Sequence, residues 1–215
     1  MGVEAVIWDF GGVFTTSPFD RFAIFEEERG LPKDFIRRIN ATNPDVNAWA
    51  KFERSEISLD EFDEAFLAEA LEAGHEVRGK EVVALLSGTV RPEMVRALDR
   101  ILEAGIRCAC ITNNVRAGHG PGISADSAAA AQVADVMARF ELIVESSKVG
   151  VRKPDPKIYE HALGELGVEA ASSVYLDDLG VNLKPAKQLG MRTIKVVKPD
   201  QALAELEEIV GFGLR

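Results

Sequence analysis

The hydrophobic positions of this chain form short, uninterrupted runs that alternate with amphipathic segments. The runs predict buried strands at 5–8, 106–111, 142–144, 173–176 and 193–197. Short apolar runs bounded by turn residues are typical of strands that are covered on both faces. Helical periodicity marks the segments 92–104, 125–139, 156–166, 182–189 and 201–209. Strands that alternate with helices in this way predict an α/β fold with a Rossmann-like parallel sheet.

Residues 17–88 depart from this alternation and carry helical patterns only. Phe19, Phe22 and Phe25 recur at a spacing that places them on one face of a helix. Further along, Ser58-Leu59-Asp60-Glu61 has the form of a capping box, which predicts that another helix opens there. We therefore expect a compact helical unit between the first and second strands.

This helical unit predicts a two-domain organisation. We expect residues 1–16 and 89–215 to form the α/β core domain, and residues 17–88 to form a helical cap domain inserted after the first strand. Seven of the eleven phenylalanines lie in this insert. They allow two interpretations, a core of the cap itself or the lining of an apolar substrate pocket beneath it.

The charge of the chain narrows its possible partners. The net charge is −10 in a chain with 47% hydrophobic and 28% charged residues, a composition ordinary for a globular protein. Nucleic acids and anionic membranes would meet net repulsion, so we expect neither as a partner. A site for an anionic ligand must create local positive charge through a metal, a lysine or backbone N–H groups.

The two cysteines, Cys108 and Cys110, indicate the redox conditions of the compartment in which the protein works. Both lie within the apolar run 106–111, where strand alternation turns them to the same face and makes a disulfide between them unfavourable. We expect two small core residues in a reducing environment. The first residues do not resemble a signal peptide, and no apolar stretch approaches the ~18 residues of a membrane span. These features predict a cytoplasmic protein.

Polar residues follow the predicted strands at the points where ligands bind in open parallel sheets. Such sheets bind ligands outside the carboxyl ends of their strands. The residues at these positions are Asp9, Thr112 with Asn113, Lys153, and Asp177 with Asp178. We therefore expect these side chains to converge on one edge of the sheet.

Together these residue types predict phosphoryl chemistry. Carboxylates from two strands make an oxygen site for a hard cation, and Mg²⁺ suits a phosphorylated substrate. Lys153 would keep Asp9 ionised, while Thr112 and Asn113 would donate to the transferring oxygens. Asp9 then becomes a nucleophile that forms an aspartyl-phosphate.

The four strand-end segments that carry these residues resemble the sequence motifs of the haloacid dehalogenase superfamily. Its pattern is hhhhDxDx[TV], then hhhh[ST]N, then a lysine, then an acidic pair. The matching segments here are Val6–Val13, Cys110–Asn113, Lys153-Pro154 and Leu176–Asp178. The helical insert is similar to the smaller cap type of that superfamily. More narrowly, the segments 149–159 and 176–186 resemble the N-terminal phosphatase domain of soluble epoxide hydrolases.

The resemblance implies a metal site. Asp9 would be both nucleophile and Mg²⁺ ligand, with the backbone carbonyl of Gly11 and the carboxylate of Asp178 completing the protein ligands. Asp177 and Asn182 would lie in the layer of residues around the metal ligands and support them.

The resemblance also implies phosphate contacts. Thr112 and Asn113 would bind phosphoryl oxygens, and Lys153 would stabilise both nucleophile and phosphate. The chain would then be a Mg²⁺-dependent phosphohydrolase or phosphotransferase acting on a small phosphorylated metabolite.

Gly11 departs from the family pattern. Most phosphatases of the family have an aspartate there that acts as general acid and base, which is typically worth about 10²–10⁴-fold in rate. Its loss predicts substrates with good leaving groups and a slow hydrolysis of the phosphorylated enzyme. Thr15 and His119 are candidates to replace the missing group.

Two other functions compete with the phosphatase reading. Dehalogenases of the superfamily also lack the second aspartate, but they need no metal, whereas the retained Asp178 favours one. A non-catalytic binding or regulatory protein would explain Gly11 as decay, yet Asp9, Thr112 and Lys153 are all retained.

Overall fold

One parallel sheet organises the chain. The computed structural model describes residues 2–86, 88–114 and 127–215. The sheet has the order β3-β2-β1-β4-β5. Its strands are β1 (Ala5–Trp8), β2 (Arg107–Thr112), β3 (Leu142–Glu145), β4 (Ser173–Asp177) and β5 (Arg192–Lys195). The predicted strands and the parallel α/β fold are confirmed, with strand ends shifted by one or two residues.

β1 lies in the centre of the sheet and sets the register of its neighbours. Trp8, its last residue, is opposite Cys110 of β2 and Leu176 of β4. The residues that follow these strands therefore meet at one edge, and Asp9 stands in the middle of that edge.

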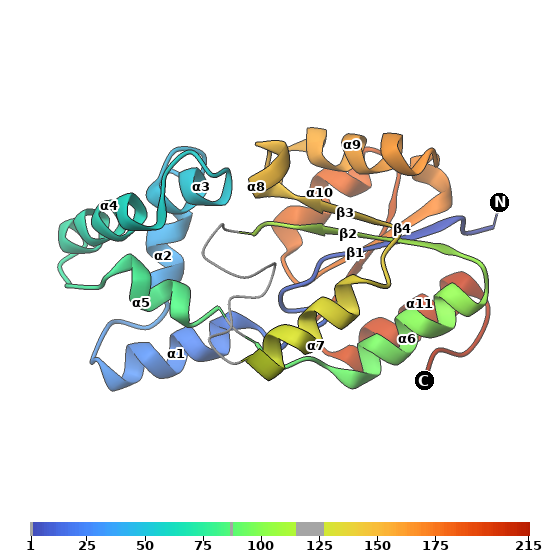
Figure 1. Ribbon diagram of the computed structural model, residues 1–215, viewed down its shortest axis with the longest axis horizontal. Coiled ribbons are helices and arrows are strands. Elements are labelled where there is room, and N and C mark those ends of the chain that lie inside the picture. The colour runs from blue at the N-terminus through green and yellow to red at the C-terminus, as the bar shows by residue number, and fades with distance from the viewer. Residues whose placement is uncertain (1, 87, 115–126) are drawn as a thin grey trace.

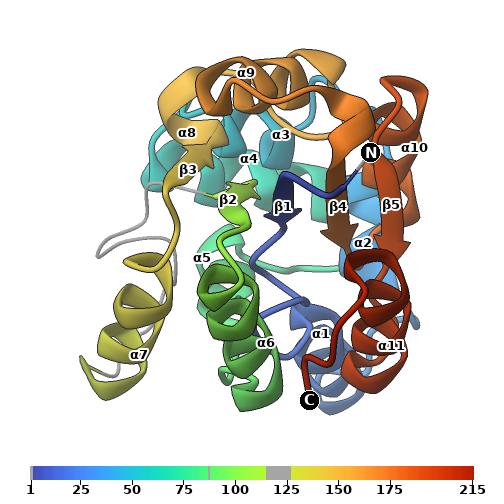
Figure 2. The ribbon, with the colours of Figure 1, turned by 90° about the vertical axis from the view of Figure 1, so that its right-hand side faces the viewer.

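Helices cover both faces of the sheet (Figures 1 and 2). Val6 and Trp8 pack with residues of α6, α7 and α11 on one face, whereas Ala5 and Ile7 pack with residues of α9 and α10 on the other. The bounds are α6 (Pro92–Glu103), α7 (Ser127–Met137), α8 (Ser146–Val149), α9 (Pro156–Leu166), α10 (Gly180–Gln188) and α11 (Pro199–Val210). This double covering explains why the strands are apolar without alternation.

The predicted helices of this part are present, with two qualifications. The helix expected at 125–139 begins in a segment that lies outside the described residues, and its described part is Ser127–Met137. The short helix α8 and a 3-10 turn at Ala170–Ser172 were not predicted.

The described residues between 17 and 88 form helices and no strand. These helices are α1 (Pro18–Glu28), α2 (Phe35–Ala41), α3 (Ala48–Glu53), α4 (Leu59–Glu72) and α5 (Gly79–Ala84). They lie beside the carboxyl ends of the strands (Figure 1). The predicted capping box opens α4, with Ser58 Oγ accepting from the N–H of Glu61 and Glu61 accepting from the N–H of Ser58. The helical insert is thus placed over the edge where Asp9 lies.

The aromatic residues of the insert form a core of their own. The buried members are Phe22, Phe35, Phe52, Phe62 and Phe66. The rings of Phe52 and Phe62 stack with centroids 4.5 Å apart and planes 9° apart. For these five residues the core interpretation holds. Phe19, Phe25 and Trp49 pack against this cluster while partly exposed.

The chain leaves and re-enters the α/β part at adjacent points. Thr15 forms a single antiparallel bridge with Val90. The N–H of Arg91 donates to the carbonyl of Phe14 at 2.7 Å, and its guanidinium donates to the carbonyl of Gly12 at 2.9 Å. These bonds join the two crossing segments directly beside the turn that follows Asp9.

Cys108 and Cys110 are both free and buried in the sheet, as predicted. Across the part of the chain that the structure describes, none of the helices combines the length and the apolar character needed to cross a membrane.

Candidate active site

Asp9 directly follows β1 in the chain and makes three polar contacts. Its N–H donates to the carbonyl of Leu176 at 2.8 Å, and its Oδ1 accepts from the N–H of Phe10 at 2.7 Å. The ammonium of Lys153 lies 2.7 Å from the same oxygen. Burial raises the pKa of the Asp9 carboxyl well above its ordinary value; Lys153 acts to lower this pKa, and the charges of Asp177 and Asp178 add to the rise.

Lys153 is the central cation of the site. Its side chain is 1% exposed, and Nζ lies 2.7 Å from Asp9 Oδ1 and 2.9 Å from Asp177 Oδ2. Burial opposes the charged form, but the two carboxylates outweigh it and raise the pKa of Lys153 above its ordinary value. The lysine is therefore an ammonium ion that bridges two carboxylates.

Asp177 is fully buried, and both of its oxygens accept hydrogen bonds. Tyr175 OH donates to Oδ2 at 2.5 Å, and the N–H of Leu179 donates to Oδ1 at 2.8 Å. The amide of Asn182 lies 3.0 Å from each oxygen. Together with Lys153, these donors fix the carboxylate behind the lysine.

The three aspartates form an acidic cluster. One carboxylate oxygen each of Asp9, Asp177 and Asp178 lies within 4.8 Å of the others. Burial, followed by the charge of Asp177, raises the pKa of Asp178 to about 6. The cluster crowds negative charge into a buried place, and this donor set suits a hard divalent cation.

Gly12 makes room for Asp178, a requirement that the sequence analysis missed. A Cβ at Gly12 would lie 2.3 Å from Asp178 Oδ2, and the backbone there has φ +75°. Both conditions exclude a side chain. The Gly-Gly pair behind the first strand was the available signal.

Thr112 ends β2 and is 5% exposed, and the side chain of the next residue, Asn113, contacts the backbone of Lys153. The Asn113 side chain accepts from the N–H of Lys153 at 2.8 Å and donates to the carbonyl of Lys153 at 3.0 Å. Its amide is committed to the lysine backbone, so a contact of this residue with phosphate is left to its own N–H group.

Gly11 is exposed, and a Cβ there would meet nothing within 4 Å. Of the two suggested replacements for the missing acid, Thr15 is buried at the crossing segments. Its Oγ1 lies 2.9 Å from where a Cβ of Gly88 would stand. His119 lies outside the described residues.

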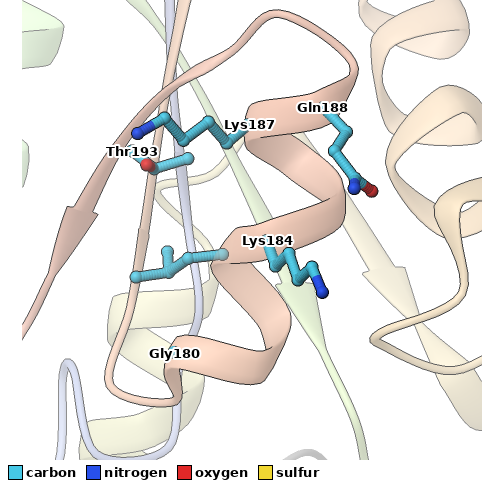
Figure 3. Close-up of a pocket in the computed structure, with 6 residues that line it drawn as sticks. Gly180, Lys184, Lys187, Gln188 and Thr193 are labelled. Carbon is cyan, nitrogen blue, oxygen red and sulfur yellow. The ribbon is translucent and has the colours of Figure 1, made fainter.

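A separate hollow of about 450 Å³ lies between α10 and β5 (Figure 3). It is lined by Gly180, Leu183, Lys184, Lys187, Gln188 and Thr193. None of the predicted site residues is among them.

Known proteins resemble this chain along nearly its whole length. A model of the haloacid dehalogenase-like hydrolase family matches residues 3–190. Acyl-CoA dehydrogenase family member 10 of Mus musculus is 33% identical over 98% of this chain and 19% of its own length. Bifunctional epoxide hydrolase 2 of Sus scrofa is 30% identical over 100% of the chain and 40% of its own length. The chain thus spans less than half the length of these relatives.

A relative of similar length carries the name of a phosphatase. Phosphatase MT3486 of Mycobacterium tuberculosis is 29% identical over 94% of this chain and 90% of its own length. The likeness to a region of epoxide hydrolase 2, expected from the segments 149–159 and 176–186, is confirmed.

Solved structures share the fold at low identity. A HAD-family enzyme of Bacteroides thetaiotaomicron, in complex with magnesium and inorganic phosphate, has TM-score 0.59 and 16% identity over 95% of this chain and 99% of its own. L-2-haloacid dehalogenase of Xanthobacter autotrophicus has TM-score 0.58 and 18% identity over 99% and 84%. Phosphate-binding and dehalogenating enzymes resemble this fold equally, so the reaction must be argued from the side chains.

Proposed function

The chain belongs to the haloacid dehalogenase-like hydrolase family, and from that premise we propose that it is a Mg²⁺-dependent phosphohydrolase or phosphotransferase acting on a small phosphorylated molecule through Asp9. The observation that carries the proposal is the contact of a buried lysine with Asp9 at 2.7 Å, beside two further aspartates. Relatives that carry the name of phosphatases support it.

Asp9 and Asp178 are the side chains that we assign to Mg²⁺, with the backbone carbonyl of Gly11. Burial, with the charges of neighbouring aspartates added, raises the pKa of both carboxyls in spite of Lys153. Asp177 is the less suitable ligand because hydrogen bonds occupy both of its oxygens. When bound, Mg²⁺ would neutralise charge on the carboxylates and on the phosphoryl oxygens.

Asp9 is the proposed nucleophile. The N–H of Phe10 and the ammonium of Lys153 both reach its Oδ1, so we assign the attack on phosphorus to Oδ2. The Oδ2–P bond forms while the bond from phosphorus to the leaving oxygen breaks. Water then attacks the aspartyl-phosphate, releasing inorganic phosphate and the free carboxylate; in a phosphotransferase a hydroxyl group takes the place of water.

In this proposal three groups stabilise the transferring phosphoryl oxygens. We assign the hydroxyl of Thr112, the N–H of Asn113 and the ammonium of Lys153 to this task, because all stand at the edge where Asp9 lies. Fixed donors in a buried site stabilise developing charge more strongly than water does.

Gly11 directs the choice of substrate. A glycine can neither protonate a leaving group nor deprotonate water, so the leaving group must depart as a stable anion. We propose sugar 1-phosphates, acyl phosphates or aryl phosphates as the substrate class. We expect the phosphorylated form of Asp9 to accumulate, because its hydrolysis lacks a general base.

We also propose a domain organisation and a cellular compartment for the chain. We propose residues 17–88 as a cap domain over the core formed by 1–16 and 89–215, and the cytoplasm as the compartment. The net charge of −10 favours a small substrate over nucleic acid.

One experiment separates this function from its two alternatives. The protein and its Asp9→Asn variant are incubated with p-nitrophenyl phosphate or a 2-haloacid, each with Mg²⁺ or EDTA. Phosphate release that needs Mg²⁺ and disappears in the variant supports the proposal. Halide release that is indifferent to EDTA would instead identify a dehalogenase, and inactivity in every arm would indicate a binding or regulatory protein.

A further inference from the structure

The helical insert makes a buried ionic contact with the loop that carries Lys153. Glu53 ends α3, and its Oε2 lies 2.7 Å from Arg152 Nε. The two side chains are 8% and 19% exposed, respectively. Arg152 also donates from Nη1 to the carbonyl of Pro44 at 2.7 Å. One residue of the loop therefore holds the insert at the end of α3 and at the turn before it.

A second bond at the same residue joins the insert to the edge of the sheet. Ser146 Oγ, at the start of α8, donates to the backbone carbonyl of Glu53 at 2.8 Å. The same oxygen accepts from the N–H of Asn114 at 3.1 Å, immediately behind β2. The ribbon shows α3 beside α8 (Figure 1). Glu53 thus contacts the segment that follows β3 in the chain and, through Ser146, the segment that follows β2.

Arg152 is connected to the proposed nucleophile, Asp9, through Lys153. Arg152 is bonded directly to Lys153 in the chain, and the backbone of Lys153 is clamped by Asn113. The side chain of Lys153 then reaches Asp9. Glu53 is therefore linked to the lysine that faces Asp9 through one residue, Arg152.

Glu53 and Arg152 form a largely desolvated ion pair. Across the described residues, Glu53 Oε2 and Arg152 Nε lie 2.7 Å apart without the alignment of a regular hydrogen bond, so the contact is chiefly an attraction between charges. Burial raises the pKa of Glu53 although Arg152 opposes the shift, which reflects the cost of desolvating the carboxylate. Buried ion pairs seldom stabilise a fold more than apolar contacts of the same shape would, although breaking one is costly.

We propose that Glu53 and Arg152 are a positioning pair that seats the helical insert on the Lys153 loop, so that Lys153 is held against Asp9 only while the insert is in place. The inference rests on the proposed function in assigning Lys153 to the reaction. It extends that function by making the insert a part of the catalytic arrangement as well as a cover for the substrate.

The test uses charge-removing variants and a matched control. Glu53→Gln and Arg152→Met each remove one charge, and the double variant leaves no unpaired buried charge. Glu56→Gln is the control, because it removes a carboxylate three residues along that pairs with Arg54 inside the insert at 2.6 Å. Circular dichroism and thermal melting establish that each variant is folded, and where a single variant fails to fold the double variant carries the test.

Kinetics with p-nitrophenyl phosphate and Mg²⁺ give the first measurement. We expect each single variant to lower kcat about tenfold or more with KM changed less than about threefold, because a misplaced catalytic group affects the transition state more than substrate binding. The double variant should be no slower than the slower single variant, as expected for two residues that act as one unit. Glu56→Gln should match the unmodified protein.

Hydrogen exchange at the N–H of Lys153 gives a measurement independent of turnover. This N–H donates to Asn113 Oδ1, and we expect faster exchange in Glu53→Gln and in the double variant, but not in Glu56→Gln. If the unmodified protein lacks phosphatase activity, the proposed function fails and the exchange result alone decides the inference. A folded double variant with unchanged kcat overturns it, as does unchanged exchange at Lys153.

Discussion

The side-chain amide of Asn113 pairs with both backbone polar groups of Lys153, at 2.8 Å to the N–H and 3.0 Å to the carbonyl. The two residues are 40 positions apart in the chain. The pairing resembles one rung of a sheet ladder made by a side chain, and it holds the loop of Lys153 on the end of β2.

We expect Asn113→Ala to lower both stability and activity. The variant leaves an N–H and a carbonyl of Lys153 without partners in a partly buried place, at a cost of about 1–3 kcal/mol. Denaturant unfolding and phosphate release measure the two effects. Asn113→Asp keeps the acceptor for the N–H but loses the donor to the carbonyl. An Ala variant as stable as the unmodified protein would contradict the clamp.

Asp9→Asn should abolish turnover and yet raise the melting temperature of the metal-free protein. The pKa of Asp9 is raised in the folded state, so the folded state prefers the protonated form, and the charged carboxyl destabilises the fold above that pKa. A neutral amide removes this penalty at pH 7. Thermal melting in EDTA makes the measurement. A lower melting temperature would show that the contact of Lys153 with Asp9 outweighs the crowding.

Stabilisation by Mg²⁺ should weaken as the pH falls below about 6. The pKa of Asp178 is about 6 when folded, above the ordinary value of 3.8, so its contribution to metal-free stability declines as the pH rises from 3.8 toward 6. Below pH 6 a proton competes with the cation for this carboxyl. We expect a larger Mg²⁺-induced rise in melting temperature at pH 7.5 than at pH 5.5. Asp178→Asn serves as the control, and an equal rise at both pH values would remove Asp178 from the metal site.

Gly11→Asp should restore part of the missing acid–base catalysis. A Cβ at this exposed position meets no neighbour within 4 Å, so the backbone there has room for a side chain to begin. We expect a gain of about tenfold or more on alkyl phosphates, a part of the 10²–10⁴-fold that such groups supply, and little gain on p-nitrophenyl phosphate. The measurement is the dependence of rate on leaving-group pKa. Gly11→Ala should give no gain, and an unmodified protein with a flat dependence would refute the assigned role of Gly11.

We expect Gly12→Ala, one residue further along the chain, to be destabilising. Its Cβ would collide with the carboxylate of Asp178 at 2.3 Å, on a backbone with φ +75°. We expect a loss of about 1 kcal/mol or more in stability and a weakened Mg²⁺ response. Comparison with Gly11→Ala isolates the effect of the position, because both changes add one methyl group. Equal behaviour of the two variants would contradict the packing of Gly12 against Asp178.

The fold was predictable where local signals agreed with it. α9 matches its predicted range because Asp155 caps it, Pro156 opens it and Gly167 ends it with φ 63°. α8 was missed because four residues are too few to show a helical period. The position of β1 between β2 and β4 depends on long-range pairing that no local pattern encodes.

The convergence of the candidate site residues was predictable, whereas the contacts among their loops were not. Asp9 and Asp178, which follow β1 and β4, converge with Lys153 of the loop after β3, as expected at the carboxyl edge of a parallel sheet. The direction of the Asn113 amide and the contact of Arg152 with Glu53 depend on how loops meet in space. Sequence spacing carries no information on such contacts.

The bridge between Thr15 and Val90 also bears on how such proteins diversify. Because the chain departs and returns side by side, the helices between these residues can be exchanged for another set without altering a strand.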